Sequence, residues 1–463
     1  MRIKEYLRKV EKGEILPSKE IPRIVEKLDK LNEKYSCFIT LNKNPRITSK
    51  KGRLRGIPVV IKDCICTKGL RTTSGSKILE NYFPVFNATI VKKIEEEGGI
   101  IVGKTSMDEF GFGTFCTNCA FNLPKNPHDI TRSAGGSSGG AAVALAMSDL
   151  PLLSIAESTG GSISCPASFC GVYGLTPTYG LVSRYGLIDY SNSLDKIGVM
   201  GKSAWDCALG LSVIAGRDSN DQTSIGEEKD YTRFVNKKYI EKNISGKIIG
   251  VPKEYFGKGV DKQVKKIVMN AIKKYESLGV KIKEISLPYT KYALSAYYVI
   301  ALAESSTNLS KFCGLRYGLA TEIKGNADEY FSSVRTKGFG KEAKRRILLG
   351  TYIRMKGYRN KYYLKALKVR KLIIEDFKKA FEKCDVLMAP TMPFIAPKFN
   401  EIKLLTPAQQ YASDILTVAP NLAGLPMINV PVGKINGMPV GLHIIGNHFE
   451  EGEILSFAGA IKW

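Results

Sequence analysis

Residues 133–140 read Ser-Ala-Gly-Gly-Ser-Ser-Gly-Gly, and residues 158–162 read Ser-Thr-Gly-Gly-Ser. Between them, residues 141–147 contain strong helix formers, and residues 152–156 form a short apolar run of strand length. This order of loop, helix, strand and loop lets both polar loops meet at one edge of a sheet, where α/β folds place ligand sites. Because glycine has no side chain, the backbone of each cluster can approach a ligand closely.

Strand and helix patterns alternate through the rest of the chain and predict an α/β fold. Further strands are expected at residues 37–41, 57–63, 100–102, 247–251, 280–285, 385–389, 428–432 and 440–445. Three longer regions have their own character: an N-terminal helical layer (1–45), a polar connector (217–232) and a long basic helical segment (339–383). No connector is rich enough in Gly, Ser or Pro to mark a domain boundary.

Composition limits the class of protein. The chain has 463 residues, of which 44% are hydrophobic, so it can bury a large core. No stretch is long and apolar enough for a membrane helix, and the charged N-terminus does not resemble a signal peptide, which predicts a cytoplasmic protein. Ten cysteines are too few for a disulfide scaffold. Cys64 and Cys66 with Cys116 and Cys119 could form a zinc site, but reduced, buried cysteines are the favoured interpretation.

The net charge of +25 is the second global feature. It indicates either a polyanionic partner such as RNA or a generally lysine-rich composition, and charge does not separate the two. The basic segment 341–383 is likewise either a solvated face or an RNA-facing surface.

Two lysines follow apolar strands. Lys62 ends the run at residues 57–61, where loss of hydration is expected to lower its pKa toward neutrality; the alternative is a surface lysine that reaches solvent. Residues 98–105, which include Lys104, match the sequence motif of a phosphate-binding loop. That interpretation is rejected, because the spacer 100–102 is itself a strand and the helix precedes it.

A serine and a lysine can perform acyl transfer without histidine. The chain has only three histidines, so few residues could serve as the histidine of a Ser-His-Asp triad. We therefore predict Lys62 as the base, Ser137 as the relay and Ser162 as the nucleophile. The backbone N–H groups of Thr159, Gly160 and Gly161, together with that of Ser162, are expected to form an oxyanion hole, where one donor is typically worth about 3 kcal/mol.

These residues resemble a known family. Lys62, the serine pair at Ser137, the run 159–162, Pro166 and Cys170-Gly171 are similar to the amidase signature family, which hydrolyses amides with a Ser-cisSer-Lys triad. The resemblance implies one large domain over residues 1–463, with a mixed central sheet covered by helices on both faces. It also implies that Ser137 follows a cis peptide bond, with Ser138 as the alternative relay.

Other stretches resemble one branch of this family, the A subunits of the glutamyl/aspartyl-tRNA amidotransferases. They are residues 178–184, 193–198, 338–346 and 421–426, with Tyr411 and Asp414. The resemblance implies a glutaminase that supplies ammonia for amidation of Glu-tRNA(Gln), Asp-tRNA(Asn) or both. It further implies a heterotrimer with amidotransferase subunits B and C, contact with tRNA mainly through the B subunit, and ATP and Mg²⁺ used by that partner, with no cofactor bound by this chain.

The same resemblance implies that Asp414 and Arg346, with Tyr297 nearby, bind the amino and carboxylate groups of glutamine. A carboxylate and a forked guanidinium suit those two groups. Without the resemblance, Arg346 would be taken for a surface charge in a basic helix. The alternative functions are those of a free-standing amidase and of a catalytically weak structural subunit.

The sequence departs from the family at Ser158 and Ser164, where the family usually has Asp and Arg. Two hydroxyls leave no unpaired buried charge, and Glu157 is expected to replace part of the missing acid. The segment before Ser162 is also one residue longer than the family pattern, which predicts a bulge near Ser154.

Overall fold

One mixed β-sheet forms the centre of the molecule, as predicted. The computed structural model describes residues 1–46 and 51–461. Within these residues, eleven strands pair in the order β1-β3-β2-β4-β6-β5-β10-β11-β9-β7-β8. β2 is parallel to β3 and β4, and β7 is parallel to β8 and β9, whereas β10 and β11 form an antiparallel pair. The strands are Phe38–Leu41 (β1), Pro58–Lys62 (β2), Ile100–Thr105 (β3), Leu153–Ser158 (β4), Tyr173–Thr176 (β5), Lys196–Gly201 (β6), Ile248–Pro252 (β7), Lys281–Ile285 (β8), Val386–Pro390 (β9), Met427–Ile435 (β10) and Met438–Gly446 (β11).

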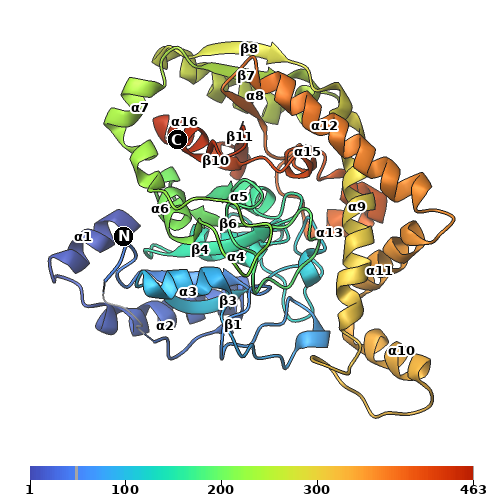
Figure 1. Ribbon diagram of the computed structural model, residues 1–463. Helices are drawn as coiled ribbons and strands as arrows, with labels where there is room; N and C mark the ends of the chain where they lie inside the picture. The colour runs from blue at the N-terminus through green and yellow to red at the C-terminus, as the bar shows by residue number, and fades with distance from the viewer. Residues whose placement is uncertain (47–50, 462–463) are drawn as a thin grey trace.

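Helices cover both faces of this sheet, because alternate strand residues face opposite cores. In β2, Val59 and Ile61 pack into the larger core, whereas Val60 packs into a second core with residues of α2 and α4. Figure 1 shows α9, α11 and α12 together on one side of the molecule. The α-helices are Ile3–Glu11 (α1), Pro17–Tyr35 (α2), Thr89–Glu96 (α3), Gly139–Met147 (α4), Ser164–Cys170 (α5), Ala204–Ile214 (α6), Lys237–Asn243 (α7), Lys262–Lys273 (α8), Ala293–Asn308 (α9), Ala327–Gly338 (α10), Lys341–Arg354 (α11), Lys365–Phe381 (α12), Phe399–Leu404 (α13), Pro407–Ala412 (α14), Val418–Leu422 (α15) and Glu451–Ala460 (α16).

The predicted strands are present, but β5 and β6 were missed. Both carry glycines, which weaken a strand pattern. Gly198 of β6 lies so close to β5 that an added Cβ would be 2.2 Å from the carbonyl oxygen of Leu175. The glycines therefore allow these two strands to pack tightly while removing the apolar signal that would identify them.

The bulge predicted near Ser154 is wrong. β4 pairs with β2 on one side and β6 on the other, and neither register shifts along it. A bulge there would disrupt hydrogen bonding on both sides of a central strand. The register shift in this region lies instead between Val59 and Val60, where β2 pairs with β3.

The three longer regions named from the sequence have the following structures. The N-terminal layer consists of α1, α2 and β1, and the polar connector leads from α6 to a 3₁₀ turn at Tyr231–Val235. The basic segment 339–383 contains two helices: α11 ends at Arg354, and a single π-helical turn at Asn360–Leu364 precedes α12. Gly357 lies in the break, where its flexibility favours a turn. No helix among residues 1–46 and 51–461 is both long and apolar enough to cross a membrane.

Candidate active site

Lys62 lies at the carboxyl end of β2 and is fully buried. Its Nζ donates hydrogen bonds to Ser137 Oγ at 2.7 Å, to the backbone oxygen of Glu157 at 3.0 Å and to Glu157 Oε2 at 2.8 Å. These acceptors match the three N–H bonds of an ammonium group. The alternative of a surface lysine that reaches solvent is therefore excluded.

The predicted fall in the pKa of Lys62 is wrong. Burial alone would lower this pKa, but the Glu157 carboxylate in direct contact outweighs burial and raises the pKa above its usual value. Glu157 belongs to β4, which runs parallel to β2, so its carboxylate reaches the same edge of the sheet. Glu157 was expected to replace part of a missing acid, but its contact with Lys62 was not predicted.

The two serine–glycine clusters lie against each other, as the fold prediction required. The Ser138 N–H donates to the backbone oxygen of Ser162 at 3.2 Å. The Gly136–Ser137 peptide bond is cis, which agrees with the family resemblance. Ser138 Oγ donates to the backbone oxygen of Glu157 at 3.1 Å. Ser137, rather than its alternative Ser138, is therefore the hydroxyl in contact with Lys62.

Ser162 lies in the turn between β4 and α5 and is 6% exposed. Among the described residues, no protein acceptor takes a hydrogen bond from the backbone N–H groups of Thr159, Gly160, Gly161 or Ser162. The carbonyl groups of this turn are engaged: Asn421 Nδ2 donates to Gly160, and the N–H of residue 165 donates to Gly161 at 2.8 Å. The turn is thus held through its carbonyls, and its N–H groups are available to a negatively charged oxygen.

Arg346 is buried, which excludes the surface-charge interpretation. It is 3% exposed, and its guanidinium donates to Glu342 Oε1 at 2.8 Å and to the Tyr190 hydroxyl at 2.6 Å. Its guanidinium carbon lies 5.0 to 5.7 Å from the ring centroids of Phe112, Tyr190, Tyr298 and Tyr411. These four rings form an aromatic box that holds the Arg346 cation by cation–π contacts. The Nη2 group of Arg346 makes neither of the two hydrogen bonds above.

Asp414 lies beside the same aromatic residues. Its carboxylate accepts hydrogen bonds from the Tyr298 hydroxyl at 2.6 Å and from Thr114 Oγ1 at 2.8 Å. Burial raises the pKa of Asp414, although both hydrogen bonds oppose that rise. Its backbone oxygen accepts a hydrogen bond from Thr417, whose side chain packs on Gly161. Asp414 is therefore linked to the turn that carries Ser162.

Tyr297 joins this group to the same turn. It packs edge-on against Tyr298, with ring centroids 5.0 Å apart. A Cβ added to Gly160 would lie 2.6 Å from the Tyr297 hydroxyl, so only glycine allows this approach. The turn that carries Ser162 therefore lies against the serine pair on one side and against Tyr297 on the other. Arg346 is connected to it through the aromatic residues beside Asp414.

Sequence reasoning did not identify the residues that hold Lys62 and Arg346 in place. Glu157 was noticed only as a replacement for the family aspartate, and Tyr190, Tyr298 and Glu342 were not identified. Tyr298 directly follows Tyr297, and Glu342 precedes Arg346 by one helical turn, so spacing alone offered a weak signal for both. Tyr190 lies in a loop, and its part in holding Arg346 depends on the three-dimensional fold.

The two departures from the family pattern leave no charge unpaired. Ser158 is fully buried, and its hydroxyl has no hydrogen-bond partner in the described part of the chain. Ser164 Oγ lies 3.4 Å from Nε2 of the buried His443, whose pKa burial lowers to about 3. Two hydroxyls therefore stand where the family pattern has Asp and Arg, and the neighbouring imidazole is neutral.

The remaining candidate residues lie outside this chemistry. His128 and His448 bind the backbone oxygens of Cys170 and Ala423, respectively. No group of three or more His, Cys, Asp or Glu residues in 1–46 and 51–461 is arranged to hold a metal ion. The rejection of a phosphate-binding loop is confirmed, because α3 precedes β3 and Lys104 is fully buried.

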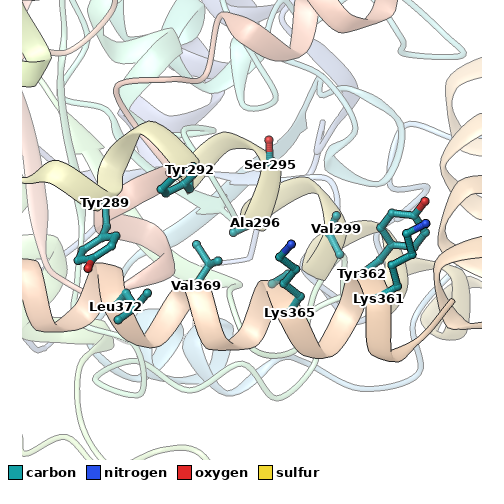
Figure 2. Close-up of a pocket in the computed structure, with 11 residues that line it drawn as sticks. Tyr289, Tyr292, Ser295, Ala296, Val299, Lys361, Tyr362, Lys365, Val369 and Leu372 are labelled. Atoms are coloured by element: carbon teal, nitrogen blue, oxygen red, sulfur yellow. The ribbon is translucent and has the colours of Figure 1, made fainter.

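The structure also contains an apolar groove of about 420 Å³ between α9 and α12. Figure 2 shows Ala296 and Val299 of α9 facing Val369 of α12 across it. Tyr297 and Tyr298 of the same helix contact the site residues instead. One helix therefore separates the groove from the candidate active site.

Comparison with known proteins identifies the class. The sequence model of the family described as Amidase matches residues 27–455. A relative from Caldanaerobacter subterraneus subsp. tengcongensis, named as the A subunit of Glutamyl-tRNA(Gln) amidotransferase, is 50% identical over 411 residues, covering 88% of this chain and 83% of the relative. One of the same name from Archaeoglobus fulgidus is 48% identical over 472 residues, covering 100% of this chain and 98% of the relative.

Solved structures support the same family assignment. The crystal structure of the Glutamyl-tRNA(Gln) amidotransferase A subunit from Thermotoga maritima has a TM-score of 0.80 and 39% identity, covering 94% of this chain and 89% of that chain. A bacterial aryl acylamidase of the amidase signature family, at 20% identity, shares the fold with a TM-score of 0.83. The chain belongs to the amidase signature family of enzymes, and within it to the branch of the amidotransferase A subunits.

Proposed function

We propose that this chain is the glutaminase subunit of a tRNA-dependent amidotransferase. The observation that carries the proposal is the 2.7 Å contact between the buried Lys62 Nζ and Ser137 Oγ, beside the turn that bears Ser162. A neutral Lys62 accepts the Ser137 proton while Ser137 accepts the proton of Ser162. Ser162 Oγ then attacks the side-chain amide carbon of glutamine. Positioned proton transfer of this kind is typically worth ~10² to 10⁴ in rate.

The turn that precedes Ser162 stabilises the charge formed in that attack. The unpaired N–H groups of Thr159, Gly160 and Gly161 face the developing oxyanion in this proposal. Collapse of the intermediate breaks the carbon–nitrogen bond, and ammonia leaves with a proton returned through Ser137. Water then hydrolyses the acyl-enzyme, which releases glutamate and restores Ser162.

Asp414 and Arg346 would select a free amino acid. The Asp414 carboxylate suits the ammonium group, and the Nη2 group of Arg346 suits the carboxylate. Tyr297 closes the space beside Gly160. Simple amides carry neither charge, so these residues favour glutamine over a neutral amide.

The relatives named as A subunits support a role in a larger assembly. In the proposal, subunits B and C complete a heterotrimer, and the B subunit binds the mischarged tRNA, Glu-tRNA(Gln) or Asp-tRNA(Asn). The same partner also uses ATP and Mg²⁺, while this chain binds no cofactor. This role implies a cytoplasmic location.

Co-expression with subunits B and C tests the proposal. Ammonia release from glutamine should rise on addition of charged tRNA and ATP, and Ser162→Ala should abolish it. Turnover of simple amides without the partners would identify a free-standing amidase. Absence of ammonia release from the intact complex would identify a structural subunit.

A further inference from the structure

Glu157 lies directly behind the predicted base. Its side chain is 4% exposed, and its two carboxylate oxygens face different partners. Oε2 lies 2.8 Å from Lys62 Nζ, and Oε1 accepts a hydrogen bond from Thr159 Oγ1 at 2.7 Å. Both oxygens are therefore fixed, and the carboxylate cannot turn away from the amine without losing a hydrogen bond.

A second carboxyl group lies behind Thr159. Thr159 Oγ1 is 2.8 Å from Asp195 Oδ1 as well as 2.7 Å from Glu157 Oε1. A hydroxyl has one proton and can donate to only one of them. The other carboxyl group must therefore carry a proton and donate it to the threonine oxygen.

Asp195 is the group that carries this proton. Glu157 contacts the Lys62 cation, whereas Asp195 has no ion-pair partner within residues 1–46 and 51–461. Burial and the nearby Glu157 both raise the pKa of Asp195 well above its usual value. The backbone N–H groups of Tyr190 and Ser191 hold its other oxygen at 2.8 and 2.9 Å. The chain of contacts therefore runs from neutral Asp195 through Thr159 to Glu157 and then to Lys62.

We propose that Glu157 is a positioning residue for the Lys62 base, which holds the amine against Ser137 and balances the charge that the amine acquires during attack. In that step, the Ser162 proton passes to Ser137 Oγ while the Ser137 proton passes to Lys62 Nζ. Lys62 ends as an ammonium group in contact with the Glu157 carboxylate. No other reactant is required, because the proton returns along the same path to the leaving ammonia.

This inference rests on the proposed function and adds a pH dependence to it. Lys62 acts only when it is neutral, and the Glu157 carboxylate favours its charged form. Glu157 therefore makes Lys62 a stronger base, but the neutral amine is present only at a more alkaline pH. Removal of the carboxylate charge should move the acid limb of the reaction to lower pH, while the plateau rate falls because a weaker base accepts the proton.

The other titratable groups near Lys62 do not produce this shift. Cys64 follows β2, and burial raises the pKa of its thiol, which disfavours the thiolate. Cys116 faces Lys62 from the 106–124 loop, and its pKa is also raised by burial. Asp108, in the same loop, has a pKa raised by burial to about 7. It would add the same limb to every variant, so it cannot imitate a change specific to Glu157.

The test measures how fast a fluorophosphonate modifies Ser162 in the full chain, as a function of pH. Ser162 Oγ forms a bond to phosphorus and fluoride leaves, so the readout needs no glutamine and no partner. Glu157→Gln keeps the size of the side chain and removes its charge. Glu157→Asp keeps the charge on a shorter side chain. Glu451→Gln is the matched control, because Glu451 is also buried but binds the N–H of Thr178.

We expect the acid limb of Glu157→Gln to move down by about 1 to 3 pH units, the usual effect of one opposite charge in contact. Glu157→Asp should keep a limb near that of the wild type with a slower plateau, and Glu451→Gln should keep both. An unmoved limb in Glu157→Gln, with Ser162 still labelled, would overturn the role of Glu157 and leave the proposed function standing. If Glu157→Gln does not fold, a limb in Glu157→Asp that moves as far as expected for charge removal would overturn it. Absence of Ser162 labelling in the wild type would instead overturn the proposed function.

Discussion

The ends of β2 and β3 offer two buried lysines in different settings. Lys62 and Lys104 lie on neighbouring parallel strands, and both are fully buried. Lys62 Nζ is 2.8 Å from the Glu157 carboxylate, whereas Lys104 Nζ is 4.0 Å from that of Asp63. Burial dominates at Lys104 and lowers its pKa, while close contact with Glu157 raises that of Lys62. A difference of about one ångström between charges therefore accompanies opposite shifts in pKa.

The two lysines also differ in what they hold. Lys104 Nζ donates to the backbone oxygen of Ile65 and to Thr72 Oγ1, so it fastens the loop after β2. Lys62 donates to Ser137, which lies against the turn that carries Ser162. Burial of a lysine is therefore not enough to indicate a catalytic base. The partner that receives its hydrogen bond distinguishes a base from a structural clamp.

The largest expected effect separates the two lysines by activity. Lys62→Met should lower glutamine hydrolysis by ~10² to 10⁴, because the proton acceptor is lost. Lys104→Met should keep most of the turnover per folded molecule. Ammonia release in the co-expressed complex measures both, with the folded fraction taken from circular dichroism. Equal losses in the two variants would remove the distinction.

Loss of Lys104 should affect stability where loss of Lys62 affects activity. Lys104→Met leaves Asp63 buried without its cation, which typically costs about 3 to 5 kcal/mol of unfolding free energy. The double variant Lys104→Met/Asp63→Asn should recover much of this loss. Urea unfolding of the single and double variants gives the coupling between the two residues. A double variant no more stable than Lys104→Met would show that Lys104 acts through the loop rather than through Asp63.

Arg346 is a third buried cation, and its proposed role is to bind the substrate. Arg346→Lys keeps a charge but loses the planar fork that four aromatic rings and Glu342 hold in place. One charged hydrogen bond is worth about 1.5 to 3 kcal/mol, so kcat/KM for glutamine should fall by roughly 10- to 100-fold. Reaction of Ser162 with a fluorophosphonate, which has no amino acid carboxylate, should change little. A similar loss for both reagents would assign Arg346 to the structure of the site.

The smallest expected effect is the pH dependence of stability. The folded-state pKa of Lys104 lies below its unfolded value of 10.5, so Lys104 makes stability rise with pH up to about 10.5. The folded-state pKa of Lys62 lies above 10.5, so the stability that it contributes is lost as pH rises through that folded value. Unfolding of each Met variant between pH 8 and 11 should therefore remove slopes of opposite sign. Slopes of the same sign would contradict the two environments.

Much of the fold could be predicted from local patterns. Apolar runs such as the one before Lys62 identified the strands that carry strong side-chain signals. β5 and β6 were not predicted because each contains glycine, which interrupts the apolar pattern of a strand. Gly174 leaves room for the side chains of Ala167 and Ile163, and Gly198 for the backbone oxygen of Leu175. The bulge near Ser154 was inferred from length alone, and length does not show that both neighbours of β4 keep their register.

The sequence predicted the site residues whose type and position in the chain indicate their chemistry. Lys62, Ser137 and Ser162 follow from a strand end and two glycine clusters, and family resemblance added Asp414, Arg346 and Tyr297. The aromatic box around Arg346 draws on segments far apart in the chain, from Phe112 to Tyr411, and no local pattern joins them. The pKa of Lys62 was misjudged for the same reason, since its sign depends on where the side chain of Glu157 points.

Covalent trapping at Ser162 tests the central claim most directly. A glutamine analogue with a chloroketone in place of its side-chain amide would form a bond to the nucleophile as chloride leaves. We expect one adduct per chain in the co-expressed complex, located by peptide mass spectrometry at Ser162, and none in Ser162→Ala or Lys62→Met. An adduct on another residue, or labelling of Ser162 that is unchanged in Lys62→Met, would contradict a lysine-activated serine as the origin of the activity.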